Sequence, residues 1–158
     1  MTSSPAILFV CLGNICRSPL AEAAFRKAAA EAGLIAEADS AGTAAYHIGS
    51  APDPRSIAVA AQNGADIAGY RGRQIAPEDY HRFTHIFALD SANLRDIRRL
   101  APDAATATVA LLLDEIDSRR GEDVADPYYG DAAGFAVTWA EVNAAARALV
   151  RRLMAEAP

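Results

Sequence analysis

The sequence has few cysteines, few lysines and no long apolar run. Cys11 and Cys16 are its two cysteines in 158 residues, too few for a disulfide framework. Lys27 stands alone beside 14 arginines, and the net charge of −5 argues against a general nucleic-acid binder. No run reaches the roughly 18 apolar residues of a membrane span, and residues 1–6 lack the basic start of a signal peptide. We expect a cytoplasmic protein without nucleic-acid or membrane partners.

The length and patterning indicate one domain over residues 1–158, with no internal repeat or linker. Short apolar runs alternate with helical patterns. Four runs predict buried strands at 6–10, 36–41, 85–89 and 108–113. Helices are expected at 19–32, from 54 onward, at 77–83, from 90 or 91 to 100, and at 134–154, with a long loop over 114–131. This alternation predicts a three-layer α/β fold, in which helices cover both faces of a four-stranded parallel sheet.

Capping residues help to place the helix ends. Ser18 followed by Pro19 predicts an N-cap and first helical position, and Gly33 predicts the end of the same helix. Asp53-Pro54 repeats the cap-and-proline pattern for the next helix. The first helix therefore follows directly on the loop 11–18, where ligands bind in parallel α/β sheets.

The loop 11–18 has the residue types of an anion-binding catalytic site. Backbone N–H groups and the helix N-terminus would cradle an oxyanion, and Gly13 and Asn14 tolerate the tight conformations that such a ring needs. Arg17 can grip two phosphoryl oxygens with its planar fork. The same field favours the thiolate of Cys11, to which Ser18 can donate a hydrogen bond. The alternatives are a small buried cysteine or a Cys-x4-Cys metal site, but the latter lacks nearby His, so we expect no metal.

Beyond this loop, several segments resemble one known family, the low-molecular-weight protein tyrosine phosphatases of bacterial type. The matching segments are Cys11-Leu12-Gly13-Asn14-Ile15-Cys16-Arg17-Ser18-Pro19, Asp39-Ser40-Ala41, Pro52-Asp53-Pro54-Arg55, Arg73-Gln74-Ile75, Asp90-Ser91-Ala92-Asn93-Leu94-Arg95-Asp96 and Asp126-Pro127-Tyr128-Tyr129-Gly130. The resemblance implies a flavodoxin-like sheet of order 2-1-3-4. It also implies a cofactor-free hydrolase that holds phosphate or another oxyanion with residues 12–18 and forms a phosphocysteine on Cys11.

Asp126 lies in a segment with Pro and Gly, which on its own predicts an ordinary turn. The resemblance makes it the general acid, which a phosphate ester with a phenolate leaving group requires. In that mechanism Asp126 protonates the phenol and later acts as base for the hydrolytic water.

Tyrosines are expected to wall the substrate slot. The resemblance places Tyr128 and Tyr129 on one side and Tyr46 on the other, where many members of the family have Trp. Tyr70 stands where some members have a His that binds Asn14, so the polar network behind the loop is expected to be built differently. Asp90 is expected either to orient Arg17 or simply to cap a helix.

The remaining expectations concern Cys16 and the three histidines. Cys16 is close enough in the loop to trap an oxidised Cys11 as a disulfide, or it simply fills space. His47, His81 and His85 have no partner pattern and are expected to be surface or core residues.

Three other functions compete with tyrosine dephosphorylation. By resemblance, phosphoarginine phosphatases carry Thr at the position of Ile15, and arsenate reductases need a further cysteine beyond Cys16. A phosphate-binding module without turnover would be expected to lack Cys11 or Asp126. We therefore expect phosphotyrosine-containing proteins as partners, a bacterial tyrosine kinase among them, for a monomer or weak dimer.

Overall fold

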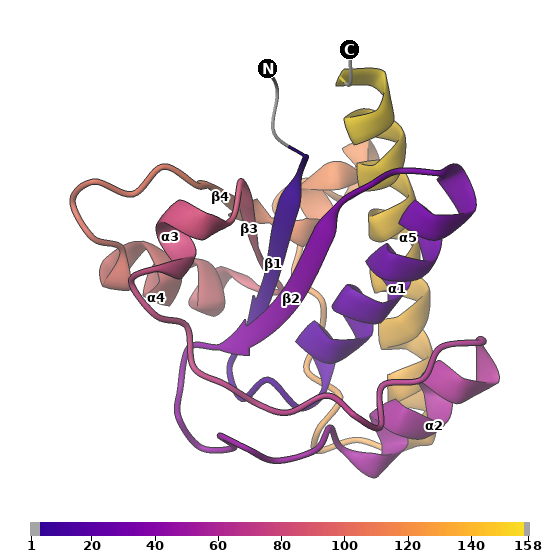
Figure 1. Cartoon of the computed structure of the whole chain (residues 1–158). Coiled ribbons are helices and arrows are strands. Elements are labelled where there is room, and N and C mark those ends of the chain that lie inside the picture. Colours follow the sequence, from indigo (N-terminus) through magenta and orange to yellow (C-terminus); the bar gives the residue numbers. More distant parts are fainter. Residues whose placement is uncertain (1–3, 157–158) are drawn as a thin grey trace.

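The computed structural model describes residues 4–156, and its centre is a parallel sheet with helices on both sides (Figure 1). The strands are β1 (Ala6–Cys11), β2 (Glu37–Gly42), β3 (His85–Ala88) and β4 (Thr108–Leu111), in the order β2-β1-β3-β4. All neighbouring strands are parallel. The expected sheet and strand order are confirmed.

Strand β1 is buried on both faces, as its unbroken apolar run predicts. Ile7 and Phe9 belong to one hydrophobic cluster, and Leu8 and Val10 belong to the other. Cys11 is the last residue of the strand and pairs with Gly42 of β2. The nucleophile candidate therefore lies at the carboxyl end of the central part of the sheet.

The helices form two layers around this sheet (Figure 1). Helices α1 (Arg17–Ala32) and α5 (Ala132–Glu156) pack on one face, with α2 (Pro54–Gln62) against both of them. Helices α3 (Asp79–Arg82) and α4 (Ser91–Leu100) contribute to the cluster on the opposite face. The predicted apolar stripe of α5 is buried in the first cluster, namely Phe135, Trp139, Val142, Ala146, Leu149 and Leu153.

Several predicted boundaries lie one or two residues from the observed ones, and two of these differences have a clear physical cause. Strand β4 ends at Leu111, and the chain turns into a 3-10 helix, η1 (Leu112–Glu115), followed by η2 (Asp117–Arg119) inside the expected loop. Leu112 and Leu113 are both buried, because this turn places them under α5. Apolar residues alone could not distinguish a buried turn from two more strand residues.

The second wrong boundary is the start of α1, which begins at Arg17 rather than Pro19. Its N-cap residue is Cys16, and no side chain caps this terminus. The other predicted caps are confirmed: Gly33 ends α1 with φ of 74°, and Asp53 accepts a hydrogen bond from the backbone of Arg55. Within residues 4–156, no helix combines the length and apolar character needed to cross a bilayer.

Candidate active site

The loop between β1 and α1 wraps around the N-terminus of α1. Asn14 has a φ of 60°, which confirms the expected left-handed residue. Gly13 does not have a positive φ, so backbone conformation is not what requires a glycine at this position. A Cβ atom built on Gly13 would lie 2.9 Å from Cδ2 of His47, so a larger residue would collide with that ring.

Ser18 contacts the candidate nucleophile instead of capping the helix. Its Oγ lies 3.1 Å from Cys11 Sγ, and Asn14 Nδ2 donates to the same oxygen over 2.8 Å. Because that oxygen accepts the amide hydrogen, the Ser18 hydroxyl hydrogen has two acceptors within reach, Cys11 Sγ at 3.1 Å and the more distant Ala41 carbonyl at 3.5 Å. The uncapped helix terminus remains available for an anion, which the helix dipole favours.

A chain of buried hydrogen bonds supports this loop from behind. Asn14 Nδ2 also donates to Ser40 Oγ over 3.0 Å, and Asn14 Oδ1 accepts from the backbone of Arg73 over 3.0 Å. Ser40 Oγ in turn donates to Glu22 Oε1 over 2.8 Å. Both the nitrogen and the oxygen of the Asn14 side-chain amide are therefore hydrogen-bonded.

Among the hydrogen bonds of residues 4–156, none joins Tyr70 to Asn14, so the network behind the loop is built without an imidazole at this position. Arg26 Nε donates to Glu22 Oε2 over 2.9 Å and closes the network on the surface side. Burial raises the pKa of Glu22, against the opposing effect of Ser40 and Arg26. Burial, followed by the charge of Glu22, raises the pKa of Tyr70 to about 12, so the phenol stays neutral.

Arg17 is almost fully buried and aims its guanidinium across the loop. Its Nη1 donates to Asp90 Oδ2 over 2.7 Å and to the Val124 carbonyl over 2.8 Å. Asp90 Oδ1 also accepts from the backbone of Asn93 and caps α4. Both roles expected for Asp90 are therefore present. Burial works against the charge of Arg17, but Cys11, Asp90 and Asp126 outweigh it and raise the pKa.

A cavity of about 230 Å³ opens over the loop and brings most of the predicted residues together. Its lining consists of Cys11, Leu12, Gly13, Ile15, Cys16, Arg17, Tyr46, His47, Asp126, Tyr128 and Tyr129. Asn14 and Ser18 lie behind the loop, where they are buried. The treatment of His47 as an ordinary surface or core residue is wrong, because its ring forms part of the pocket wall against Gly13.

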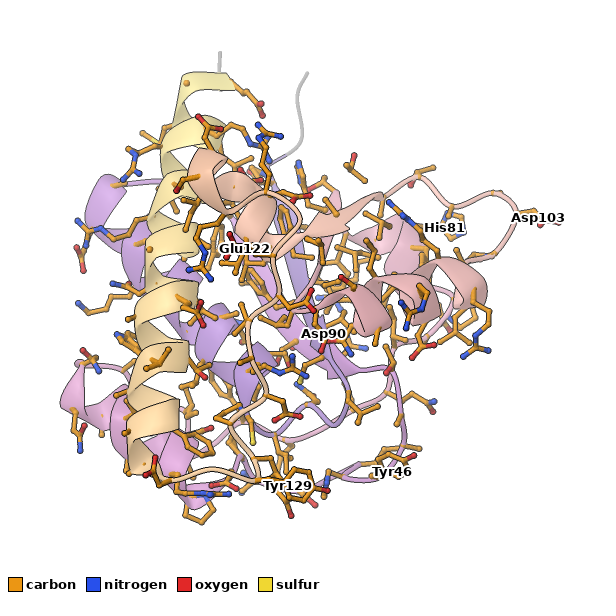
Figure 2. All side chains as sticks on the ribbon, turned by 180° about the vertical axis from the view of Figure 1, so that it is seen from behind. Tyr46, His81, Asp90, Asp103, Glu122 and Tyr129 are labelled. Atoms are coloured by element: carbon orange, nitrogen blue, oxygen red, sulfur yellow. The ribbon has the colours of Figure 1, made fainter. Side chains whose placement is uncertain are left out.

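The tyrosines form an exposed rim. Tyr128 and Tyr129 meet edge to face with ring centroids 4.9 Å apart, and Figure 2 shows Tyr129 and Tyr46 at the same end of the molecule. Tyr46 is 75 % exposed and Tyr129 is 94 % exposed. Asp126 lies at the base of this rim, with Oδ2 3.7 Å from Nη2 of Arg17. Its Oδ1 accepts a hydrogen bond from the backbone of Tyr128.

Cys16 is a free, buried thiol in the same pocket. Burial, and then the charges of Asp53, Cys11 and Asp126, raise its pKa to about 12. Cys16 is therefore protonated at neutral pH. Among residues 4–156, no group of three or more His, Cys, Asp or Glu side chains is arranged to hold a metal ion.

The matching segments supply the supports of the site, which the sequence did not reveal. Ser40 and Arg73 hold Asn14, and the backbone of Asp53 donates to the Ile15 carbonyl over 2.9 Å. These contacts join residues far apart in the chain. The only signal of them in the sequence was that these segments take part in the resemblance.

Known proteins of one family resemble this chain along most of its length. A family profile described as low molecular weight phosphotyrosine protein phosphatase matches residues 6–158. A relative from Schizosaccharomyces pombe with the same description is 45 % identical over 138 residues, covering 85 % of this chain and 88 % of the relative.

Solved structures agree with this result. The crystal structure of YfkJ from Bacillus subtilis has a TM-score of 0.91 and 35 % identity, covering 99 % of both chains. An arginine phosphatase from Drosophila has a TM-score of 0.87 and 29 % identity, covering 92 % of this chain and 96 % of that one. The profile match, the fold and the arrangement around Cys11 agree, and this chain belongs to the low molecular weight phosphotyrosine protein phosphatase family.

Proposed function

We propose that this protein hydrolyses phosphotyrosine in proteins through a phosphocysteine on Cys11, without a metal ion. The observation that carries the proposal is the meeting of Cys11, Arg17 and Asp126 in one pocket with a tyrosine rim. The buried loop offers an anion cradle, and the rim offers an apolar wall for an aromatic ring.

In the first step, Cys11 Sγ attacks phosphorus and the bond from phosphorus to the phenolic oxygen breaks. Arg17 and the backbone N–H groups of the loop bind the phosphoryl oxygens. Asp126 gives its proton to the departing phenolate, which is otherwise a poor leaving group. The products are tyrosine and the phosphocysteine.

In the second step, water attacks the phosphocysteine and the sulfur–phosphorus bond breaks. Asp126 takes the proton of the attacking water and returns to its acid form. The Ser18 hydroxyl, held 3.1 Å from Sγ by a hydrogen bond from Asn14, donates to the departing thiolate and stabilises it. Inorganic phosphate leaves and the cycle closes.

Ile15 favours phosphotyrosine over phosphoarginine. Its side chain lines the pocket, where a Thr hydroxyl would be expected in an arginine phosphatase. Arsenate reduction is disfavoured because the sequence has no cysteine beyond Cys16 to resolve the intermediate. We further propose a cytoplasmic setting, because a reducing compartment keeps two such thiols free. A bacterial tyrosine kinase is proposed among the substrates.

We also propose that Cys16 protects Cys11 from irreversible oxidation. A peroxide would convert the Cys11 thiolate to a sulfenic acid, and Cys16 would then form a disulfide with loss of water. Because the pKa of Cys16 is about 12, we expect this closure to be slow at neutral pH. The measurement is inactivation by excess peroxide followed by thiol rescue, which Cys16→Ser should reduce, because its unprotected sulfenic acid is oxidised further to irreversible forms. Equal rescue of both proteins would contradict the role.

The deciding experiment offers a phosphotyrosine peptide, phosphoarginine and arsenate side by side in the presence of a chelator. We expect phosphate release from the phosphotyrosine peptide, preceded by a burst of dephosphorylated peptide. Cys11→Ser should release no phosphate. Asp126→Asn should lose roughly 10²–10⁴-fold in rate. Asp103→Asn is the matched control, since Asp103 lies on an exposed turn away from the pocket (Figure 2). Turnover by Cys11→Ser, or a requirement for metal, would refute the mechanism.

A further inference from the structure

Arg55, in the first turn of α2, reaches across to the loop that carries Asp126. Its Nη2 donates to the Tyr128 carbonyl over 2.9 Å, and its Nη1 donates to the Gly130 carbonyl over 3.0 Å. One guanidinium therefore binds two backbone carbonyls of the loop 126–130 from outside that loop.

The Arg55 side chain is itself fixed in place. Asp53 Oδ1 accepts from Nε over 3.0 Å and Asp53 Oδ2 accepts from Nη2 over 2.9 Å, a two-pronged ion pair. The guanidinium also lies over the rings of Phe135 and Tyr128, with its central carbon 4.5 Å and 5.8 Å from their centroids. A planar fork with these partners has little freedom to move.

The same short segment is attached to the phosphate-binding loop. The backbone N–H of Asp53 donates to the Ile15 carbonyl over 2.9 Å, and Ser56 Oγ donates to the Cys16 carbonyl over 3.3 Å. Residues 53–56 therefore connect the loop of the nucleophile to the loop of the acid.

The acid loop, residues 126–130, makes few other hydrogen bonds to the rest of the molecule. Among the hydrogen bonds of residues 4–156, those of Arg55 alone link 127–130 to another element, and the other bonds of this segment are local turns. On the other side of the loop, Asp126 approaches Arg17 to 3.7 Å, and two residues earlier Val124 bonds to Arg17 and to the Leu89 carbonyl. Val124 therefore anchors the chain before Asp126, and Arg55 supplies the hydrogen bonds that hold the chain after it.

We propose that Arg55 is a positioning residue for proton transfer, because it holds the loop that sets Asp126 over Cys11. The proposal deepens the function proposed above and rests on Asp126 as the acid. Arg55 would touch neither substrate nor phosphate, and its loss should therefore affect the step in which Asp126 gives up its proton.

Leaving-group dependence separates this role from a structural one. Phenyl phosphate needs protonation of its phenolate, whereas 4-nitrophenyl phosphate has a far more acidic leaving group and needs it less. We expect Arg55→Ala to reduce kcat/KM about tenfold more for phenyl phosphate than for 4-nitrophenyl phosphate. In an Asp126→Asn background, Arg55→Ala should add little further loss, since coupled residues are not additive.

Further variants guard against misfolding. Arg55→Lys keeps the charge but cannot span both carbonyls, and should fall between the wild type and Arg55→Ala. Arg99→Ala removes an exposed arginine of α4 that pairs with Asp96, and should leave both substrates unchanged. Inhibition by inorganic phosphate should persist in Arg55→Ala, because the phosphate-binding loop keeps its own contacts.

The outcomes are distinguishable. An equal loss on both substrates, a fully additive loss in the Asp126→Asn background, or a loss of phosphate inhibition would overturn the role of Arg55. If Asp126→Asn itself shows no leaving-group dependence, the proposed acid fails and the role of Arg55 fails with it. The predicted leaving-group dependence, the small further loss in the Asp126→Asn background and intact phosphate inhibition would together support Asp126 as the acid and Arg55 as its positioning residue.

Discussion

The two loops that form the pocket are built in opposite ways. In the phosphate-binding loop the polar side chains are buried, and Ser18 and Asn14 are 0 % and 3 % exposed. In the acid loop Tyr129 is 94 % exposed, and the hydrogen bonds to other elements come from one arginine. Charge that develops on phosphate is best met by fixed donors, whereas a loop that admits a protein substrate must leave room.

This contrast suggests a division of labour. The buried network is preorganised before substrate arrives, and mutations in it should reduce the rate and the stability together. The exposed rim should affect substrate affinity more than chemistry. The following predictions test the contrast, beginning with the buried side.

Arg17→Lys should have the largest effect. Lysine cannot bind Asp90 and the Val124 carbonyl while presenting a planar fork to phosphate. We expect a loss in kcat/KM on the order of 10²–10³-fold, similar to removal of an oxyanion donor. Arg98→Lys on α4 is the control and should keep full activity. Near-normal turnover by Arg17→Lys would show that a point charge suffices in this loop.

Asn14→Ala should have the next largest effect. It removes the bonds to Ser18, Ser40 and the Arg73 backbone, and places a Cβ-bearing residue without a polar side chain at φ of 60°. We expect a loss of about 1–3 kcal/mol in the free energy of unfolding and slower release of phosphate from the phosphocysteine. Asn63→Ala removes one amide bond at the end of α2 and should keep activity. A destabilised but fully active Asn14→Ala would separate the network from the chemistry.

Glu22 should give the buried network a pH-dependent stability. Burial raises its pKa in the folded protein above the unfolded value of about 4.3. The folded state then binds more protons in this window, so stability is greatest below it and falls as pH rises through the folded pKa. Measured by urea unfolding, the free energy of unfolding of the wild type, relative to that of Glu22→Gln, should fall as the pH rises from 4. Glu31→Gln, which removes an exposed carboxylate of the same helix, should show no such slope.

The sequence predicted those parts of the molecule in which local chemistry and tertiary contacts agree. The buried run of β1, the apolar stripe of α5 and the Asp53 cap required no knowledge of distant residues. Ser18 was misassigned as an N-cap because a Ser-Pro pair is a good helix start, whereas its expected contact with the nucleophile is present, with Oγ 3.1 Å from Cys11 Sγ. His47 was missed because its place in the pocket depends on the approach of its loop to Gly13.

The smallest effect is expected on the exposed rim, at Tyr129. A ring that is 94 % exposed gains little by covering a substrate, and its edge contact with Tyr128 can be lost without opening the core. We expect Tyr129→Ala to raise KM for a phosphotyrosine peptide about threefold, within the range of one aromatic pair, while kcat stays unchanged. Val137→Ala, an exposed apolar residue of α5 outside the pocket, should change neither constant. A drop in kcat for Tyr129→Ala would mean that the rim also holds Asp126, and the division between a fixed loop and a permissive one would then lie inside the acid loop itself.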